Sequence, residues 1–226
     1  MANVICLDFD DTIVLENTTR QIHARFAAEG WEEAERRRAR GELTVEQANA
    51  AAFATIEAEE GEMREYAVSV ARPRAGFLEL LDWAHWNDWM PVVVSNGYDF
   101  YVDAILASLG VDRVPQHAGR TMRDYRWRVR YYSPRGIEIE DGFKLSYAAA
   151  FRSAGDFVAY VGDGASDVAA AKLAPAVFAR STLLEELTGR HARLRPFETF
   201  HDVITTLEQE APEWLASFSS TTAGAD

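Results

Sequence analysis

The chain has 226 residues, with 36 Asp and Glu against 23 Lys and Arg, so its formal net charge is −13. Such an acidic chain argues against nucleic-acid and membrane partners, because both bind through positively charged surfaces. The length fits one domain, alone or with an insertion, and 48% hydrophobic residues suffice for a sizeable core. The single cysteine, Cys6, excludes an internal disulfide and a Cys-rich metal site. No membrane span or signal peptide is visible, so we expect a cytoplasmic protein.

The first part of the chain combines one strand with a helical segment. An apolar run at residues 4–7 predicts a buried strand, and acidic residues follow it at once. The next stretch contains helix signals and no convincing strand. These signals are the spacing of Ile22 and Phe26, the charged run from Glu32 to Arg40, and the capping-box pair Thr44 and Gln47. We therefore predict an all-helical insertion over residues 16–72, with residues 1–15 and 73–226 forming the core.

After Pro73, amphipathic helices alternate with short apolar runs. Helices are predicted at 77–84, 102–109, 144–151, 168–173, 183–187 and 203–207. Buried strands are predicted at 91–94, 157–161 and 176–179, a hairpin at 125–139, and a fraying tail at 219–226. Continuous apolar strands that alternate with helices are typical of a parallel sheet covered on both faces. The predicted fold class is α/β, with a Rossmann-like, doubly wound parallel sheet and an inserted helical cap.

Polar side chains follow three of these strands. Asp8 and Asp10 follow the first strand, Ser95 the second and Asp163 the third. Ligands of open parallel sheets bind outside the carboxyl ends of the strands. We therefore expect these side chains to converge on one site.

The chemistry of that site follows from its charges. Its carboxylates are Asp8, Asp10, Asp163 and Asp167. When they share one crevice, their like charges repel, and each raises the pKa of the others. A hard cation relieves this repulsion, and oxygen ligands favour Mg²⁺. Lys144 and the Ser95 hydroxyl add donors for an anionic group, so a phosphoryl group that bridges the cation and Lys144 satisfies every partner.

Four motifs in this pattern resemble those of haloacid dehalogenase (HAD) superfamily phosphatases. Asp8–Thr12 resembles the D-x-D-x-T motif, and Val92–Gly97 resembles the apolar strand that ends in Ser. Lys144 resembles the third motif, and Gly162–Asp167 the fourth, G-D-G-x-x-D. Order and spacing agree over nearly the whole chain, and the helical insertion resembles a C1 cap.

The resemblance implies an enzyme, a phosphoric monoester hydrolase. Asp8 would be the nucleophile that forms an aspartyl-phosphate. Asp10 would protonate the leaving oxygen and then activate water. Mg²⁺ would be held by Asp8, Asp163 and the backbone carbonyl of Asp10, with Asp167 in support.

Two further sets of residues are candidates for contact with the substrate, the first from the resemblance and the second from position in the chain. The phosphate-binding set comprises Thr12, Ser95, Asn96 and Lys144. Residues near predicted loop ends that could line the substrate pocket are Glu16, Tyr98 and Tyr101, and Arg128 in the predicted hairpin could bind a second anionic group. The five histidines show no metal-ligand spacing, so we assign them structural roles. Ser95 could in addition cap the helix that follows it.

Different segments of the chain resemble two branches of the superfamily. Gly41–Gln47 resembles the cap of phosphoserine phosphatases, but the following Asn49–Ala52 lacks the Arg that those enzymes use to bind the substrate carboxylate. Ser95–Phe100 and Ala170–Leu173 resemble the methionine-salvage phosphatases, which act on a phosphorylated keto-methylthiopentenyl compound. The segment 117–141 departs from that branch because it is rich in Arg and aromatic residues and has no Cys.

The substrate that fits these observations is a small phosphorylated metabolite, and the chain is expected to be a monomer or a homodimer. Two alternatives stay open. The first is a phosphotransferase or mutase that uses the same aspartyl-phosphate. The second is a binding protein that keeps the fold without turnover.

Overall fold

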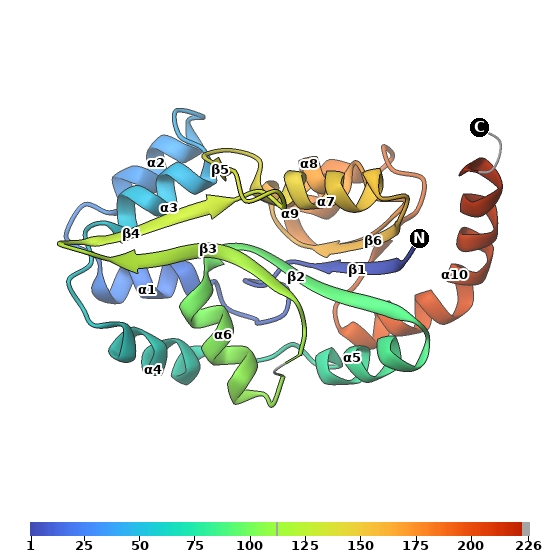
Figure 1. Cartoon of the computed structure of the whole chain (residues 1–226), viewed down its shortest axis with the longest axis horizontal. Coiled ribbons are helices and arrows are strands. Elements are labelled where there is room, and N and C mark those ends of the chain that lie inside the picture. The colour runs from blue at the N-terminus through green and yellow to red at the C-terminus, as the bar shows by residue number, and fades with distance from the viewer. Residues whose placement is uncertain (112, 223–226) are drawn as a thin grey trace.

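The computed structural model describes residues 1–111 and 113–222, whose strands form one sheet in the order β5-β4-β3-β2-β1-β6-β7-β8 (Figure 1). The strands are β1 (Asn3–Leu7), β2 (Trp89–Tyr98), β3 (Gln116–Arg123), β4 (Trp127–Tyr132), β5 (Glu138–Ile139), β6 (Phe157–Gly162), β7 (Ala176–Ala179) and β8 (Leu194–Pro196). β3, β2, β1, β6, β7 and β8 run parallel. β4 and β5 add an antiparallel edge, so the sheet is mixed.

Helices cover both faces of this sheet, as the predicted fold class requires. In Figure 1, α5 (Phe77–Trp86) and α6 (Asp99–Ser108) lie on one side, and α10 (Phe200–Thr222) packs against α5. α7 (Phe143–Ser153), α8 (Val168–Ala171) and α9 (Ser181–Leu187) lie on the other. The central strands β1 and β6 are buried along almost their whole length. The sequence prediction of a Rossmann-like α/β core is confirmed.

The segment between β1 and β2 is helical up to α5, as predicted. It contains α1 (Thr18–Phe26), α2 (Glu32–Ala39), α3 (Val45–Phe53) and α4 (Glu60–Val70). An isolated bridge between Val14 and Pro73 brings the two ends of this segment together. In Figure 1 its helices gather at one end of the molecule, around the β3–β4 hairpin. α3 packs on β4 and α4 packs on α6, so the segment contacts the sheet and its covering helices.

The structure corrects several predicted boundaries. The predicted hairpin over 125–139 is β4 with β5, and β4 also pairs with the unpredicted β3. The sequence did not predict β3, because its residues are mostly half-buried or exposed and form no apolar run. It did not predict β8, which has only three residues. β2 continues through Ser95 to Tyr98, with an irregularity in its pairing after Val94.

The predicted fraying tail is also wrong in part. Residues 219–222 continue α10, and residues 223–226 lie outside the described part of the chain. Among the helices that the structure describes, none combines the length and the apolar character needed to cross a membrane.

The predicted capping box at the start of α3 is present. Thr44 Oγ1 accepts a hydrogen bond from the Gln47 amide at 3.1 Å, and Gln47 Oε1 accepts one from the Thr44 amide at 3.1 Å.

We predict that Thr44→Ala lowers the free energy of unfolding by about 1 kcal/mol, because the first turn of α3 loses its cap. Urea denaturation measures this change. Thr44→Ser keeps the hydroxyl and should retain most of the stability, and equal losses in both variants would contradict the capping role.

Candidate active site

A cleft of about 340 Å³ lies at the carboxyl ends of β1, β2 and β6. Its core side is lined by the strand-end residues Asp8, Asp10, Ser95, Asn96 and Asp163, together with Lys144 from α7. Residues of α1, α2 and α3 line the opposite side. The strand-end residues that the sequence analysis expected to converge therefore line one cleft. The volume lies near the lower end of the range for small-molecule sites.

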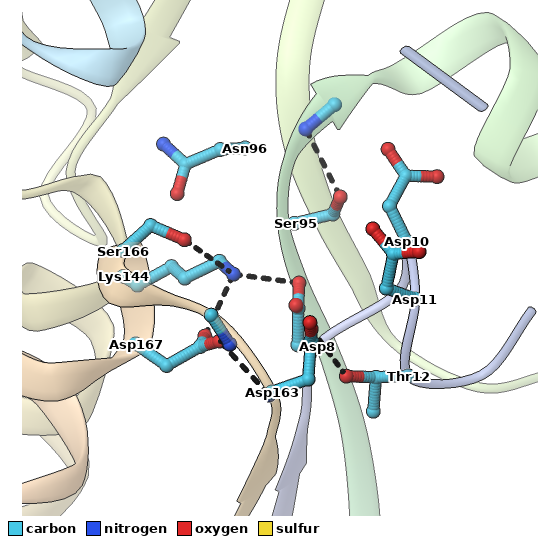
Figure 2. A network of polar contacts seen from close by, with 12 residues as sticks. Asp8, Asp10, Asp11, Thr12, Ser95, Asn96, Lys144, Asp163, Ser166 and Asp167 are labelled. Atoms are coloured by element: carbon cyan, nitrogen blue, oxygen red, sulfur yellow. Dashed lines mark hydrogen bonds and ion pairs between the residues drawn. The ribbon is translucent and has the colours of Figure 1, made fainter. Parts of the chain in front are cut away.

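Lys144 forms the centre of this site. Its ammonium Nζ lies 2.6 Å from Asp8 Oδ1 and 2.7 Å from Asp167 Oδ1. Figure 2 shows the ammonium between these two carboxylates. All three side chains are buried. Burial lowers the pKa of Lys144, but the charges of Asp167 and Asp8 raise it by more, so the pKa lies above its usual value and the amine is charged.

Asp167 shapes the loop after β6 as well as pairing with Lys144. Its Oδ1 accepts the Tyr160 hydroxyl at 2.7 Å, and its Oδ2 accepts the amides of Gly164 at 2.9 Å and Asp163 at 3.2 Å. A Cβ at Gly162 would lie 2.8 Å from Asp167 Cγ, so this close approach requires glycine. Asp167 thereby fixes the backbone that carries Asp163.

Three carboxylates meet at a spacing that suits a divalent metal ion. Asp8, Asp163 and Asp167 each offer one oxygen, and these oxygens lie within 4.8 Å of one another. Burial and the Asp167 charge raise the pKa of Asp8, with Lys144 opposing, and the same two causes raise the pKa of Asp163 to about 6. A bound cation would relieve this repulsion, so the donor set fits such an ion. The Asp10 side chain is not part of this cluster, and its backbone ligand role stays a prediction.

Asp10 is held by two helices. Its Oδ1 accepts the Thr18 amide at 3.0 Å, and its Oδ2 accepts the Thr19 hydroxyl at 3.0 Å and the Tyr101 hydroxyl at 2.6 Å. Burial raises the pKa of Asp10, and the hydrogen bonds from Tyr101 and Thr19 oppose that rise. A Cβ at Gly97 would lie 1.6 Å from the Tyr101 hydroxyl oxygen, so Tyr101 can reach Asp10 only because residue 97 is glycine.

Ser95 and Asn96 are fixed by different partners. Ser95 Oγ accepts the Gly97 amide at 3.0 Å and does not cap α6, which begins only at Asp99, so the capping prediction is wrong. The Asn96 side-chain amide donates to Glu46 Oε1 at 3.0 Å, and the backbone carbonyl of Asn96 accepts a hydrogen bond from Asn49 Nδ2 at 2.7 Å. Asn96 is thus tied to α3, and both Ser95 and Asn96 face the cleft.

Several predicted ligand residues do not line the cleft. The Thr12 hydroxyl donates to Asp163 Oδ1 at 3.1 Å, and its side chain is fully buried. Glu16 binds the Arg72 amide at 2.9 Å and pairs with its guanidinium. Arg128 pairs with Asp124 at 3.5 Å on the β3–β4 hairpin. Tyr98 and Tyr101 are fully buried and do not line the cleft. For Glu16, Tyr98 and Tyr101, a position near a predicted loop end did not fix the direction of the side chain.

His23 lines the cleft, although the sequence gave it only a structural role. Its Nε2 lies 2.5 Å from the Tyr98 hydroxyl oxygen, and its ring packs 5.3 Å from that of Trp31, measured between centroids. The spacing of four residues from Thr19 on α1 is the signal that could have placed it on this face.

Arg74 and Asp11 are two further residues whose roles sequence reasoning missed. Arg74 is buried and donates to the carbonyls of Asp11 at 2.6 Å, Thr12 at 2.7 Å and Glu198 at 3.1 Å. Asp11 has a φ of +60°, in the left-handed region, and its carboxylate accepts the Asn17 side-chain amide at 2.9 Å. These contacts hold the loop that carries Asp10.

The sequence of this chain is similar to those of known proteins. Residues 5–172 match the family model described as haloacid dehalogenase-like hydrolase. The chain belongs to the haloacid dehalogenase-like hydrolase family. It is 30% identical over 210 residues to a 2-hydroxy-3-keto-5-methylthiopentenyl-1-phosphate phosphatase of Bacillus thuringiensis subsp. konkukian (strain 97-27), covering 91% of this chain and 95% of the relative. The relationship confirms the predicted HAD-type phosphatase class.

Solved structures agree on the fold. A phospho-aspartyl intermediate analogue of phosphoserine phosphatase matches with a TM-score of 0.67 at 22% identity, over 90% of this chain and 98% of that one. A substrate-bound phosphoserine phosphatase complex matches with a TM-score of 0.66 at 21% identity, over 91% and 98%. The predicted position beside the phosphoserine and methionine-salvage branches is confirmed.

The Tyr101 hydroxyl gives a first test of the site. We predict that Tyr101→Phe lowers kcat about 10-fold with little change in KM, because Asp10 loses a charge-assisted hydrogen bond. Steady-state phosphate release measures this. Tyr66→Phe on α4 removes a hydroxyl that, among the described residues, donates a hydrogen bond to Gln21 and to no other side chain, and it should leave kcat unchanged. Equal kcat values for Tyr101→Phe and the unmodified enzyme would contradict the role of Tyr101.

His23 gives a test by pH. Burial lowers the pKa of His23 to about 4, from an ordinary value of 6.5. The unfolded chain therefore binds an extra proton between these values, so stability present at pH 7 is lost as the pH falls. We predict that the free energy of unfolding drops by about 2 kcal/mol more between pH 7 and pH 5 in the unmodified protein than in His23→Gln.

Urea denaturation at both pH values measures this difference. The exposed His85 supplies the control, because His85→Gln should leave the pH dependence unchanged. An identical drop in His23→Gln and the unmodified protein would contradict the assignment of His23 as a buried neutral group.

Proposed function

We propose that this protein is a Mg²⁺-dependent phosphatase that hydrolyses the phosphate monoester of a small metabolite through an aspartyl-phosphate on Asp8. The observation that carries the proposal is the buried Lys144 ammonium, 2.6 Å from Asp8 and 2.7 Å from Asp167, in the same cleft as Asp163. This arrangement combines a carboxylate nucleophile, a cation for phosphoryl oxygens and a donor set for a metal ion.

Each residue has a defined part in the proposed reaction. Asp8 attacks phosphorus, and the bond from phosphorus to the leaving oxygen breaks as Asp10 gives that oxygen a proton. Asp10 then takes a proton from the water that hydrolyses the aspartyl-phosphate. Lys144 and the Ser95 hydroxyl donate to the phosphoryl oxygens and stabilise their charge.

The metal ion belongs to the same proposal. The residues that would hold Mg²⁺ are Asp8, Asp163 and the carbonyl of Asp10, with Asp167 in support. When bound, Mg²⁺ neutralises charge on the carboxylates and on the phosphoryl group. Lys144 alone leaves the four carboxylates with an excess of negative charge, which supports the need for a cation.

We also propose that residues 16–72 form a cap over a core of residues 1–15 and 73–226. The support is structural, because α1, α2 and α3 line the cleft opposite the strand ends. Such a cap excludes water and contacts the leaving group. The volume of about 340 Å³ suits a small metabolite. The named relatives act on such compounds, a phosphorylated methylthiopentenyl ketone and phosphoserine.

We predict that Asp8→Asn and Asp10→Asn each lower turnover about 1,000-fold or more, because one removes the nucleophile and the other the proton donor. A phosphate-release assay with an aryl phosphate measures this, with Mg²⁺ and with EDTA. Asp82→Asn, at an exposed position on α5, is the matched control and should keep full activity. Unchanged activity in Asp8→Asn, or in EDTA, would contradict the proposed mechanism. Transfer of phosphate to an added alcohol without release of free phosphate would favour a phosphotransferase.

A further inference from the structure

Arg20 of α1 lines the cleft. It lies in the first turn of α1, on the same wall as Asn17 and His23, which are three residues away on either side. Thr19, the residue before it, bonds to Asp10, the proposed proton donor for the leaving oxygen. Arg20 therefore stands on the side of the cleft where the leaving group must lie.

The Arg20 guanidinium has no bonded partner among the described residues. Over residues 1–111 and 113–222, its guanidinium makes no hydrogen bond or ion pair. The other cations that line the cleft have carboxylate partners. Lys144 pairs with Asp8 and Asp167, and Arg38 pairs with Glu35 at 3.0 Å. Among the described residues, Arg20 is therefore the cation of the cleft whose side chain has no ion-pair partner.

Helix stability does not explain this placement. A cation in the first turn of a helix faces the positive end of the helix dipole, which is unfavourable. The first turn of α1 contains no acidic residue that would offset this charge. Asn17 Oδ1 accepts the Arg20 amide at 3.0 Å, and Asp10 takes the amides of Thr18 and Thr19. Because these amides already have partners, the Arg20 guanidinium is the group of this turn that can bind an anion in the cleft.

The same wall is poorly suited to an apolar leaving group. Trp31 and Val45 supply its hydrophobic side chains, and the remaining residues that α1, α2 and α3 contribute are polar or charged. A polar leaving group with its own negative charge matches this lining better than an apolar chain does.

We propose that Arg20 binds a second anionic group, a carboxylate or a second phosphate, on the leaving group of the substrate. The planar guanidinium can bind either group with two parallel hydrogen bonds. This inference rests on the proposed phosphatase function and narrows its substrate class to phosphate monoesters that carry another anion.

Two substrate pairs test the inference. D-3-phosphoglycerate and glycerol 3-phosphate differ by a carboxylate, and fructose 1,6-bisphosphate and fructose 6-phosphate differ by a second phosphate. Values of kcat/KM are measured for all four compounds and for an aryl phosphate, with the unmodified enzyme, Arg20→Gln and Arg20→Lys. Arg25→Gln is the matched control, because Arg25 is also exposed on α1 but does not line the cleft.

The unmodified enzyme should prefer the anionic member of at least one pair. Arg20→Gln should lower kcat/KM for that member about 10- to 100-fold, mainly through KM, as expected for the loss of a charge-assisted hydrogen bond. Arg20→Lys should lose less, and Arg25→Gln should lose nothing. The preferred pair shows whether the second anion is a carboxylate or a phosphate.

Two outcomes would overturn the inference. One is the absence of any preference for the anionic member in both pairs while the aryl phosphate is hydrolysed. The other is an equal loss toward anionic and neutral compounds in Arg20→Gln. A failure of the unmodified enzyme to hydrolyse even the aryl phosphate would instead contradict the proposed function, so the two failures are distinguishable.

Discussion

The site depends on one buried ion-pair network, in which Lys144 lies between Asp8 and Asp167. Removal of such charges from water costs several kcal/mol per ion, and a buried ion pair recovers this only with good geometry. Here both N–O distances are below 3 Å, at 2.6 and 2.7 Å. The parallel pairing of β1 with β6 sets this geometry, because it places Asp8 beside the loop that carries Asp167, with the Asp8 amide donating to the Val161 carbonyl at 2.9 Å. Since such a network contributes little to stability, we attribute it to the chemistry.

A second constraint joins the helical segment to that chemistry. Asp10 comes from the loop after β1, but its carboxylate is held by the first turn of α1 and by Tyr101 of α6. Glu46 of α3 reaches the same edge, accepting the Asn96 side-chain amide at 3.0 Å and the Phe143 amide, at the start of α7, at 2.9 Å. A movement of the helical segment would therefore shift the Asp10 carboxylate and Asn96. Contacts between this segment and the leaving group would in this way affect proton transfer by Asp10.

The sequence predicted the parts that depend on local pattern. Buried strands that end in Asp8, Ser95 and Asp163 follow from apolar runs and from sheet topology, and the capping box at Thr44 follows from local hydrogen bonding. The structure brings these strand-end residues together in one cleft. Helices α1 to α4 also form in the stretch where the sequence carries helix signals.

The remaining features depend on contacts between distant segments. Arg128 and Glu16 were expected at the substrate, but ion pairs with Asp124 and Arg72 hold them elsewhere. His23 was not expected there, because its burial arises from packing against Tyr98 and Trp31, which come from other elements. β3 escaped prediction because its pairing with β2 and β4, not its composition, makes it a strand.

The proposed mechanism requires that Asp8 becomes phosphorylated during turnover. The most direct measurement is a rapid acid quench of the enzyme with a phosphate-labelled substrate, followed by peptide mapping of the bound label. We expect label on the peptide that contains Asp8, with the alkali sensitivity of an acyl phosphate and with decay on a chase with unlabelled substrate. Release of labelled phosphate with no label on the protein, or label on Ser95 instead, would contradict it.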